Sequence, residues 1–280
     1  MSQLHEALPR AALKPLVLDF ESHGVGERDD RKFITALARG LEVLRAFQSQ
    51  TGRMSNKEIS ELTNIPKPSI TRLTYTLSEM GYLQQSNIDG KYELSAGILS
   101  LGYPLLSGLA IRHLAHDQMA ELANSGGCSV ALGARDRLSI VYVDECCGNS
   151  STTLRLDIGA RIEIARSAIG RAWLAGLSEE LRQDMYKQLD IAYHTEWPEL
   201  RSRIEDAESQ IKERGFCLVD QEWRKDTRTV SVPLVSNDGK TVMALSCGGP
   251  TFSISVASLE EEFGPRLRHI GEKISRFLGK

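Results

Sequence analysis

The chain lacks the long apolar segments of membrane proteins. None of its hydrophobic runs approaches the roughly 18 residues that a membrane-spanning helix needs. Its first 30 residues have no basic end followed by an apolar core, so they lack the form of a secretory signal. These absences predict a cytoplasmic protein with no membrane partner, and we interpret residues 1–30 as a mobile tail.

Cysteine is also scarce, which argues against a disulfide framework. The five cysteines include no C-x-x-C pair, and no pair has a histidine at zinc-ligand spacing; they are Cys128, Cys146, Cys147, Cys217 and Cys247. We therefore expect no metal site and no structural disulfide. The adjacent Cys146 and Cys147 allow a redox sensor, but two reduced thiols at a strand end are the simpler interpretation.

Catalytic motifs are missing as well. The sequence has no G-x-S-x-G elbow, no P-loop and no H-E-x-x-H, and its histidines are scattered, as at His113, His116, His194 and His269. We therefore predict that the protein is not an enzyme and needs no cofactor.

Residues 53–80 predict two short helices joined by a turn. Ser55 and Glu58 have the Ser-x-x-Glu form of a capping box at the start of the first helix. Pro66 ends the first helix, and Pro68 suits the first turn of the second helix. The second helix has a predicted buried stripe at Ile70, Leu73, Leu77 and Met80.

A supporting helix is predicted before this pair and a hairpin after it. The supporting helix would face inward through Ile34, Leu37, Leu41, Leu44 and Phe47. After Gly81, strand-like runs at 82–85 and 91–94 flank the turn-forming residues 87–90. This order predicts a winged helix-turn-helix, whose physical use is to bind duplex DNA. A protein-docking role for such a module stays open.

The outward face of the second helix carries side chains that can donate to phosphates or base edges. We expect Arg72 to make the strongest contact. The candidate DNA-binding residues are Arg53, Ser55, Lys67, Ser69, Thr71, Arg72, Tyr75 and Lys91. Residues 31–94 carry 9 Lys or Arg and 6 acids, a net charge of about +3 in a chain of net charge −3. Two copies on a two-fold operator would double the phosphate contacts.

The rest of the chain predicts linker helices and an α+β domain. Residues 95–125 form two predicted helices that meet near 107–110, where Pro104 and Gly108 favour a break. Strands are predicted at 128–134, 138–145, 152–158, 161–166, 216–219, 228–235 and 241–247, and helices at 167–176, 178–189, 199–214 and 258–278. The predicted sheet is mostly antiparallel. The domain boundaries are then 1–30, 31–94, 95–125 and 126–280.

Three places in residues 126–280 suit a small molecule. A helix that begins at Ser167 would offer free N–H groups and its dipole to a carboxylate. Just after a strand, Trp223 can cover an apolar body and Arg224 can pair with an acid. Residues 245–250 end another strand in small side chains. An ordinary N-cap, a surface loop and a plain turn explain these places comparably well.

Several segments in this order resemble the IclR family of bacterial transcriptional regulators. They are ALARGLEVL, EISELTNIPKPSITRLTYTLSEMGYL, YELSAGILSLG, RSAIGRAWLA, RGFCLVDQEW and VSVPLVSNDGKTVMALSCGGP, within a similarity that runs from about Phe33 to the C-terminus. The resemblance implies a winged helix-turn-helix joined by a linker helix to a GAF-like effector domain. It also implies dimers or tetramers, and control of a nearby catabolic operon by a small organic acid or aromatic compound.

The resemblance also implies an effector pocket. Carried over position by position, its residues are Ala168, Ile169, Gly170, Asp220, Thr229, Ser246 and Gly248. A Cys often stands in the family at the position of Thr229 and a second Ser at that of Gly248, and the loop at Ala168 and Ile169 is bulkier than the family's Gly-rich form. These departures argue against a very small keto acid. The candidate effector-binding residues, with those of the preceding motifs, are Ser167, Ala168, Ile169, Gly170, Asp220, Trp223, Arg224, Thr229, Ser246 and Gly248.

The sequence thus predicts a ligand-responsive, DNA-binding transcriptional regulator. Its expected partners are a palindromic operator in double-stranded DNA, a small organic or aromatic acid, and further copies of the chain in a homodimer or homotetramer. The alternative is an enzyme that acts on a small carboxylate and carries an accessory winged-helix head.

Overall fold

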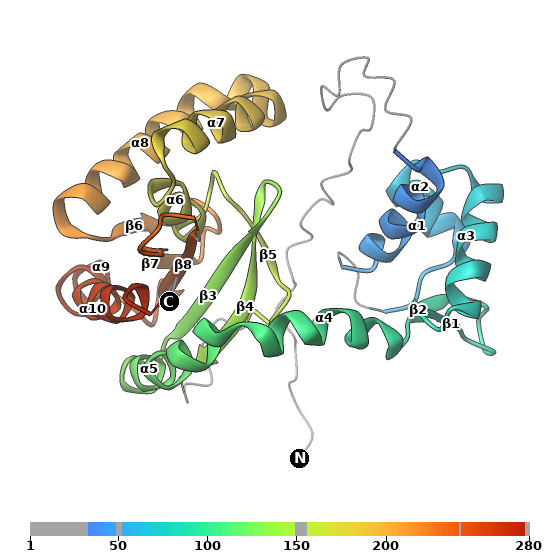
Figure 1. Cartoon of the computed structure of the whole chain (residues 1–280), viewed down its shortest axis with the longest axis horizontal. Coiled ribbons are helices and arrows are strands. Elements are labelled where there is room, and N and C mark those ends of the chain that lie inside the picture. The colour runs from blue at the N-terminus through green and yellow to red at the C-terminus, as the bar shows by residue number, and fades with distance from the viewer. Residues whose placement is uncertain (1–32, 49–51, 149–155, 241, 278–280) are drawn as a thin grey trace. The chain divides into compact units, whose positions relative to one another are not determined.

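The computed structural model describes residues 33–48, 52–148, 156–240 and 242–277. The chain divides into two compact units, at residues 1–105 and 106–280 (Figure 1). The tail predicted at residues 1–30 lies outside the described residues, as do residues 152–155 of a predicted strand.

The first unit contains a winged helix-turn-helix, as predicted. Its helices are α1 (Thr35–Ala46), α2 (Asn56–Thr63) and α3 (Lys67–Glu79), and the antiparallel strands β1 (Leu83–Gln85) and β2 (Tyr92–Leu94) form the wing. The predicted capping box starts α2. The Ser55 hydroxyl accepts a hydrogen bond from the backbone N–H of Glu58, and the Glu58 carboxylate accepts one from the backbone N–H of Ser55. Pro68 lies in the first turn of α3.

The inner face of α3 differs from the prediction at one end. Ile70 and Leu77 are buried and Leu73 is half-buried, but Met80 is 59% exposed, so its predicted place in the core is wrong. Met80 is the C-cap of α3 and its N–H still donates to the carbonyl of Thr76 at 3.0 Å, but its side chain lies past the end of the packed face. Thr74 is fully buried instead, because its hydroxyl donates back to the carbonyl of Ile70 at 3.0 Å and needs no water.

The supporting helix α1 turns only part of the predicted stripe inward. Phe47 is buried and Leu44 half-buried as predicted, and Val43 and Ala46 are buried with them. Ile34, Leu37 and Leu41 are instead 63%, 60% and 49% exposed. The prediction that these three residues face the core is therefore wrong. Only the C-terminal half of α1 packs into the core of the head, so the apolar side chains of its first half are exposed in the part of the chain that the structure describes.

The predicted linker helices are α4 (Gly97–Gly108) and α5 (Ala110–Gly126), and they meet at Leu109 as expected. The break does not occur at Pro104, which lies inside α4. No side chain of α4 is buried. Within the described residues no single helix is long and apolar enough to cross a membrane; only α4 and α5 taken together pass that test, and the chain bends by 80° between them.

The second unit is an α+β domain built on an antiparallel sheet. Its strands are β3 (Ser129–Asp136), β4 (Ser139–Cys147), β5 (Arg161–Glu163), β6 (Cys217–Asp220), β7 (Thr227–Val235) and β8 (Val242–Pro250), in the order β5-β4-β3-β8-β7-β6. Successive side chains of a strand point to opposite faces, so the sheet has two apolar cores. Val130 and Leu245 pack on the side of α5 and α10 (Gly264–Ser275), while Ala131 and Ala244 pack on the side of α6 (Ala168–Ala175) and α8 (Trp197–Arg214).

Two predicted elements of this unit differ in the structure. The expected C-terminal helix is instead α9 (Val256–Ser258), a π-helical turn (Leu259–Phe263) and α10, because Pro265 lacks an N–H and fits only the first turn of a helix. The described end of the predicted strand 152–158 is a turn that leads into Gly159, at φ +91°. The expected helix at 178–189 is α7, which extends over Glu179–Tyr193.

Candidate DNA-binding surface and effector cavity

The outer face of α3 is open in the described structure. Lys67, Thr71, Arg72 and Tyr75 are exposed, and Ser69 is half-buried. Arg72 and Lys67 have no ion-pair partner among the described residues. Asn56 of α2 donates to the Thr71 hydroxyl at 3.3 Å, so the second helix of the motif positions a side chain of the third.

The wing holds its two cations in ion pairs. Arg53 lies 3.6 Å from Asp89 and 3.5 Å from Glu93, and it also donates to the Ser86 hydroxyl at 2.7 Å. Lys91 lies 3.1 Å from Glu58. The predicted phosphate contacts from these two cations would have to replace existing partners, unlike those from α3.

The hydroxyl and backbone N–H of Ser55 are both used in the capping box of α2. Its backbone and hydroxyl are the main causes that lower the pKa of Glu58 to about 2, with a further contribution from Lys91. The charged carboxylate therefore stays available to close the capping box across the physiological pH range. The geometry gives Ser55 a structural role, which leaves its predicted DNA contact untested.

The second unit contains a small cavity beside the start of α6. Its wall combines aromatic, aliphatic and hydroxyl-bearing side chains with one carboxylate, Glu222. The lining residues are Ser129, Tyr142, Leu156, Ile162, Ser167, Ala168, Ile169, Val219, Glu222, Trp223, Thr227, Thr229, Ser246 and Gly248. A mainly apolar wall with a few polar groups is typical of small-molecule sites.

Seven of the predicted effector-binding residues meet at this cavity: Ser167, Ala168, Ile169, Trp223, Thr229, Ser246 and Gly248. Gly170, Asp220 and Arg224 do not line it. A Cβ on Gly170 would lie 2.3 Å from the carbonyl oxygen of Ile164, so this glycine lets α6 pack closely on the backbone of the segment that precedes it. Asp220 pairs with Arg228 at 3.0 Å, and Arg224 pairs with Asp226 at 2.8 Å.

The first residues of α6, Ala168 and Ile169, line the cavity together with the capping residue Ser167. Ser167 caps the helix: its hydroxyl accepts from the N–H of Gly170 at 3.2 Å and donates to the carbonyl of Glu163 at 2.6 Å. Ser167 therefore has no hydroxyl proton left for a ligand. The N–H groups of Ala168 and Ile169 belong to the first turn, where a helix has no internal acceptors for them.

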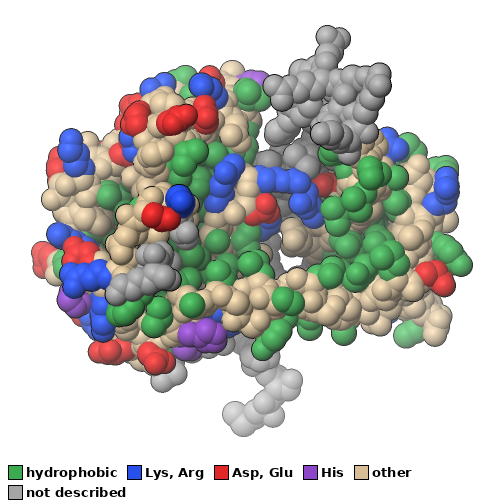
Figure 2. Space-filling model, in the orientation of Figure 1, with side chains coloured by type: hydrophobic (Ala, Val, Ile, Leu, Met, Phe, Trp, Pro, Cys, Tyr) green, Lys and Arg blue, Asp and Glu red, His purple; other side chains and the backbone are tan. Residues whose placement is uncertain are grey.

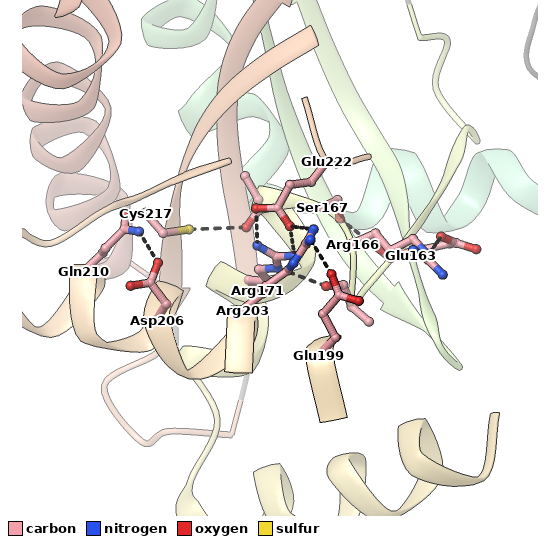
Figure 3. Close-up of polar contacts among 12 residues, drawn as sticks. Glu163, Arg166, Ser167, Arg171, Glu199, Arg203, Asp206, Gln210, Cys217 and Glu222 are labelled. Carbon is pink, nitrogen blue, oxygen red and sulfur yellow. Dashed lines mark hydrogen bonds and ion pairs between the residues drawn. The ribbon is translucent and has the colours of Figure 1, made fainter. Parts of the chain in front are cut away.

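Sequence reasoning missed Glu222, the charged group of the lining. Its carboxylate accepts two hydrogen bonds from Arg171, at 3.1 and 2.7 Å, and one from Arg203 at 2.8 Å (Figure 3). Arg171 is only 2% exposed and also donates to the carbonyl of Ala165 at 2.9 Å. Burial raises the pKa of Glu222, but Arg171 and Arg203 outweigh it and lower that pKa below its usual value. The ion pair between Arg171 of α6 and Glu222 anchors the loop that contains Trp223 to α6.

Tyr142 was also missed, because a tyrosine in a strand carries no positional signal. It lies on β4, is 7% exposed and lines the cavity. Burial raises the pKa of its phenol, and a hydrogen bond with Ser246 only partly offsets that rise. Two neutral hydroxyls from different strands thus lie together in the wall of the cavity.

Comparison with known proteins assigns both units. Residues 36–87 match the IclR helix-turn-helix domain, and residues 104–276 match the family described as bacterial transcriptional regulator IclR C-terminal. The HTH-type transcriptional regulator TsaQ1/TsaQ2 of Comamonas testosteroni is 29% identical over 86% of this chain and 87% of its own length.

Solved structures agree. An IclR family transcriptional regulator from Brucella abortus is 41% identical, with a TM-score of 0.80 over 90% of this chain and 95% of that one. An IclR homolog from Microbacterium hydrocarbonoxydans, complexed with 4-hydroxybenzoate, has the same fold at 18% identity, with a TM-score of 0.66 over 86% of this chain and 97% of that one. The chain belongs to the IclR family of transcriptional regulators, with an N-terminal DNA-binding domain and a C-terminal effector-binding domain.

Proposed function

We propose that the protein controls a catabolic operon by binding a palindromic operator as a homodimer and sensing a small organic or aromatic acid. One observation carries the proposal: the chain combines an α3 face whose cations have no ion-pair partner among the described residues with a mainly apolar cavity in a separate unit. Ligand binding in one unit would shift the population of arrangements in which two α3 helices fit the DNA.

On the DNA side, α3 supplies both kinds of contact that a regulator needs. Arg72 can form a bidentate pair with a guanine, and Lys67 can meet a phosphate at the start of the helix. Thr71 and Tyr75 are exposed on the same face and can contact neighbouring bases or sugars. The wing contributes less charge, because Arg53 and Lys91 are already paired.

The exposed apolar side chains of the head support a dimer. Ile34, Leu37 and Leu41 form an exposed stripe at the start of α1, and α4 exposes Leu99, Leu101, Tyr103 and Leu105. Figure 2 shows hydrophobic side chains gathered on this part of the surface. Such a concentration of exposed apolar side chains marks an interaction surface, and a second copy offers the same stripe in a two-fold arrangement. A homotetramer would add a further interface.

On the ligand side, the cavity fits a small aromatic or hydroxylated acid. The free N–H groups of Ala168 and Ile169 suit a carboxylate, and the rings of Tyr142 and Trp223 offer aromatic surface. Hydroxyls of Thr229 and Ser246 can bond a polar substituent. The IclR homolog complexed with 4-hydroxybenzoate has the same fold, and its ligand is an acid of this class, which supports the proposal.

The DNA assignment is tested with duplexes that the wild-type protein selects from a random-sequence pool. Fluorescence anisotropy at fixed salt should show that Arg72→Ala loses about 1–3 kcal/mol of binding free energy, roughly 5- to 150-fold in Kd. The matched control is Lys91→Ala, whose cation is already neutralised and whose loss should weaken binding less. Equal affinities of wild type and Arg72→Ala would refute the assignment, and binding that ignores salt would favour protein docking.

The effector assignment is tested by thermal shift against a panel of small keto acids, benzoate and hydroxybenzoates. A ligand should raise Tm in a concentration-dependent way and should change operator affinity in the same concentration range. Recovery of the ligand as a chemically changed product would support the enzyme alternative.

A further inference from the structure

Two cysteines far apart in the sequence meet inside the second unit. The sulfur atoms of Cys128 and Cys247 lie 3.3 Å apart, although 119 residues separate them in the chain. Both residues are buried, at 2% and 0% exposure. Among the described residues Cys217 bonds a carbonyl at 3.6 Å and Cys146 lies 3.7 Å from a ring nitrogen of His116, so neither has a thiol at this distance.

The sheet brings the two thiols together. Ser129 pairs with Gly248 and Val130 pairs with Cys247 in the antiparallel β3–β8 ladder. Cys128, just before β3, is therefore a diagonal neighbour of Cys247 on the adjacent strand. A disulfide needs its sulfurs at about 2.05 Å, which leaves about 1.2 Å to close. By contrast Cys146 and Cys147 are successive residues of β4, whose side chains point to opposite faces of the sheet.

We propose that Cys128 and Cys247 are a site of reversible thiol oxidation by a peroxide. The thiolate of Cys128 attacks one peroxide oxygen, the O–O bond breaks, and Cys128 becomes a sulfenic acid as the other oxygen leaves as water or alcohol. The Cys247 sulfur then attacks the Cys128 sulfur, water leaves, and an S–S bond forms. The peroxide takes up the two electrons that the thiols lose.

The local chemistry assigns the two sulfurs different roles. A hydrogen bond from Cys247 is the main cause that lowers the pKa of Cys128, against the effect of burial, and the charge of Arg266 adds to it. The same bond and burial raise the pKa of Cys247. These directions, together with the slightly greater exposure of Cys128, favour Cys128 as the attacking thiolate and Cys247 as the resolving thiol.

The position of the pair links it to two parts of the unit. Cys247 lies between Ser246 and Gly248, which line the cavity, and Cys128 precedes Ser129, which also lines it. The backbone N–H of Cys128 donates to the carbonyl of Ala123 at 3.2 Å, at the end of α5. A covalent bond here would join the end of α5 to the strand under the cavity, whatever ligand the cavity takes.

The test uses the folded full-length protein and hydrogen peroxide, followed by denaturation, alkylation of free thiols and peptide mass spectrometry. We expect a peptide pair joined through Cys128 and Cys247 with the loss of two hydrogen atoms, and reversal by dithiothreitol. The five alkylated cysteines should fall to three and return to five. Cys217→Ser, a buried cysteine outside the pair, is the control and should still form the cross-link.

Cys247→Ser should abolish the cross-link and leave Cys128 oxidised to sulfenic or sulfinic acid. The wild-type peptide map decides the matter even if this variant folds poorly. Five free thiols after treatment, overoxidation of Cys128 without a disulfide, or a bridge between any other two cysteines would each overturn the proposal.

Discussion

Replacing Glu222 by alanine removes the carboxylate that neutralises the buried guanidinium of Arg171. Three hydrogen bonds are lost, two from Arg171 and one from Arg203. Breaking a buried ion pair by deleting one partner costs about 3–5 kcal/mol, because the remaining charge is left in a poorly solvated site. The Glu222 side chain is 25% exposed, so we reduce the expected cost for solvent screening to about 2–3 kcal/mol.

Urea denaturation of the full-length protein, followed by tryptophan fluorescence, measures this cost. With an m-value of about 2–3 kcal/mol per molar, the midpoint of the second unit should fall by about 1 M. The matched control is Arg203→Ala, whose side chain is 43% exposed and which should cost about 0–1 kcal/mol. Because Arg171→Leu removes the charge that Glu222→Ala leaves unpaired, the double variant should be more stable than the sum of the single effects.

Two results would refute this reasoning. An equal loss of stability in Glu222→Ala and Arg203→Ala would mean that burial of Arg171 does not set the cost. Strict additivity in the double variant would mean that the two groups do not interact in the folded protein.

Three further predictions concern pH, assembly and packing. The pKa of Glu222 is lowered on folding, so its contribution to stability is present above the unfolded pKa, near 4.3, and is lost as the pH falls through the folded pKa. When the free energy of unfolding is measured against pH, it should decline less steeply below about pH 4 in Glu222→Ala than in the wild type. Parallel curves for the two proteins would contradict this prediction. Leu37→Asp should change the stability of the monomer by no more than about 0.5 kcal/mol, since the side chain is 60% exposed, but should weaken the dimer at least tenfold by sedimentation analysis; an unchanged dimer would place the interface elsewhere. Gly170→Ala should destabilise the second unit by about 1–3 kcal/mol, because its Cβ would lie 2.3 Å from the Ile164 carbonyl, and an unchanged Tm would show that α6 moves freely.

Local signals in the sequence predicted most of the fold. The capping box at Ser55, the turn before Pro68 and the hairpin around 87–90 depend on a few neighbouring residues, and the structure confirms each of them. The buried stripe of α1 was predicted correctly at Phe47 and wrongly at Leu37 and Leu41, because periodicity reports an apolar face without saying what covers it. Leu37 and Leu41 have the spacing of core residues, yet they are exposed among the described residues.

The cavity was predictable only in part, for a related reason. Ser167, Ser246 and Gly248 stand out as small or capping residues within recognisable local patterns. Glu222 and Tyr142 gain their roles from partners that are distant in the sequence, Arg171 at 51 positions and Ser246 on another strand. The contact between the sulfurs of Cys128 and Cys247 depends likewise on strand register, which composition does not reveal.

The self-neutralised wing has a consequence for how such a regulator is distributed over a chromosome. Arg53 and Lys91 already have acidic neighbours, so they should displace fewer of the counterions condensed on DNA. The non-specific affinity for DNA should then stay low. If α3 reads the operator as proposed, less of the protein would be held at the large excess of non-specific sites, and fewer molecules per cell would be needed to fill the operator.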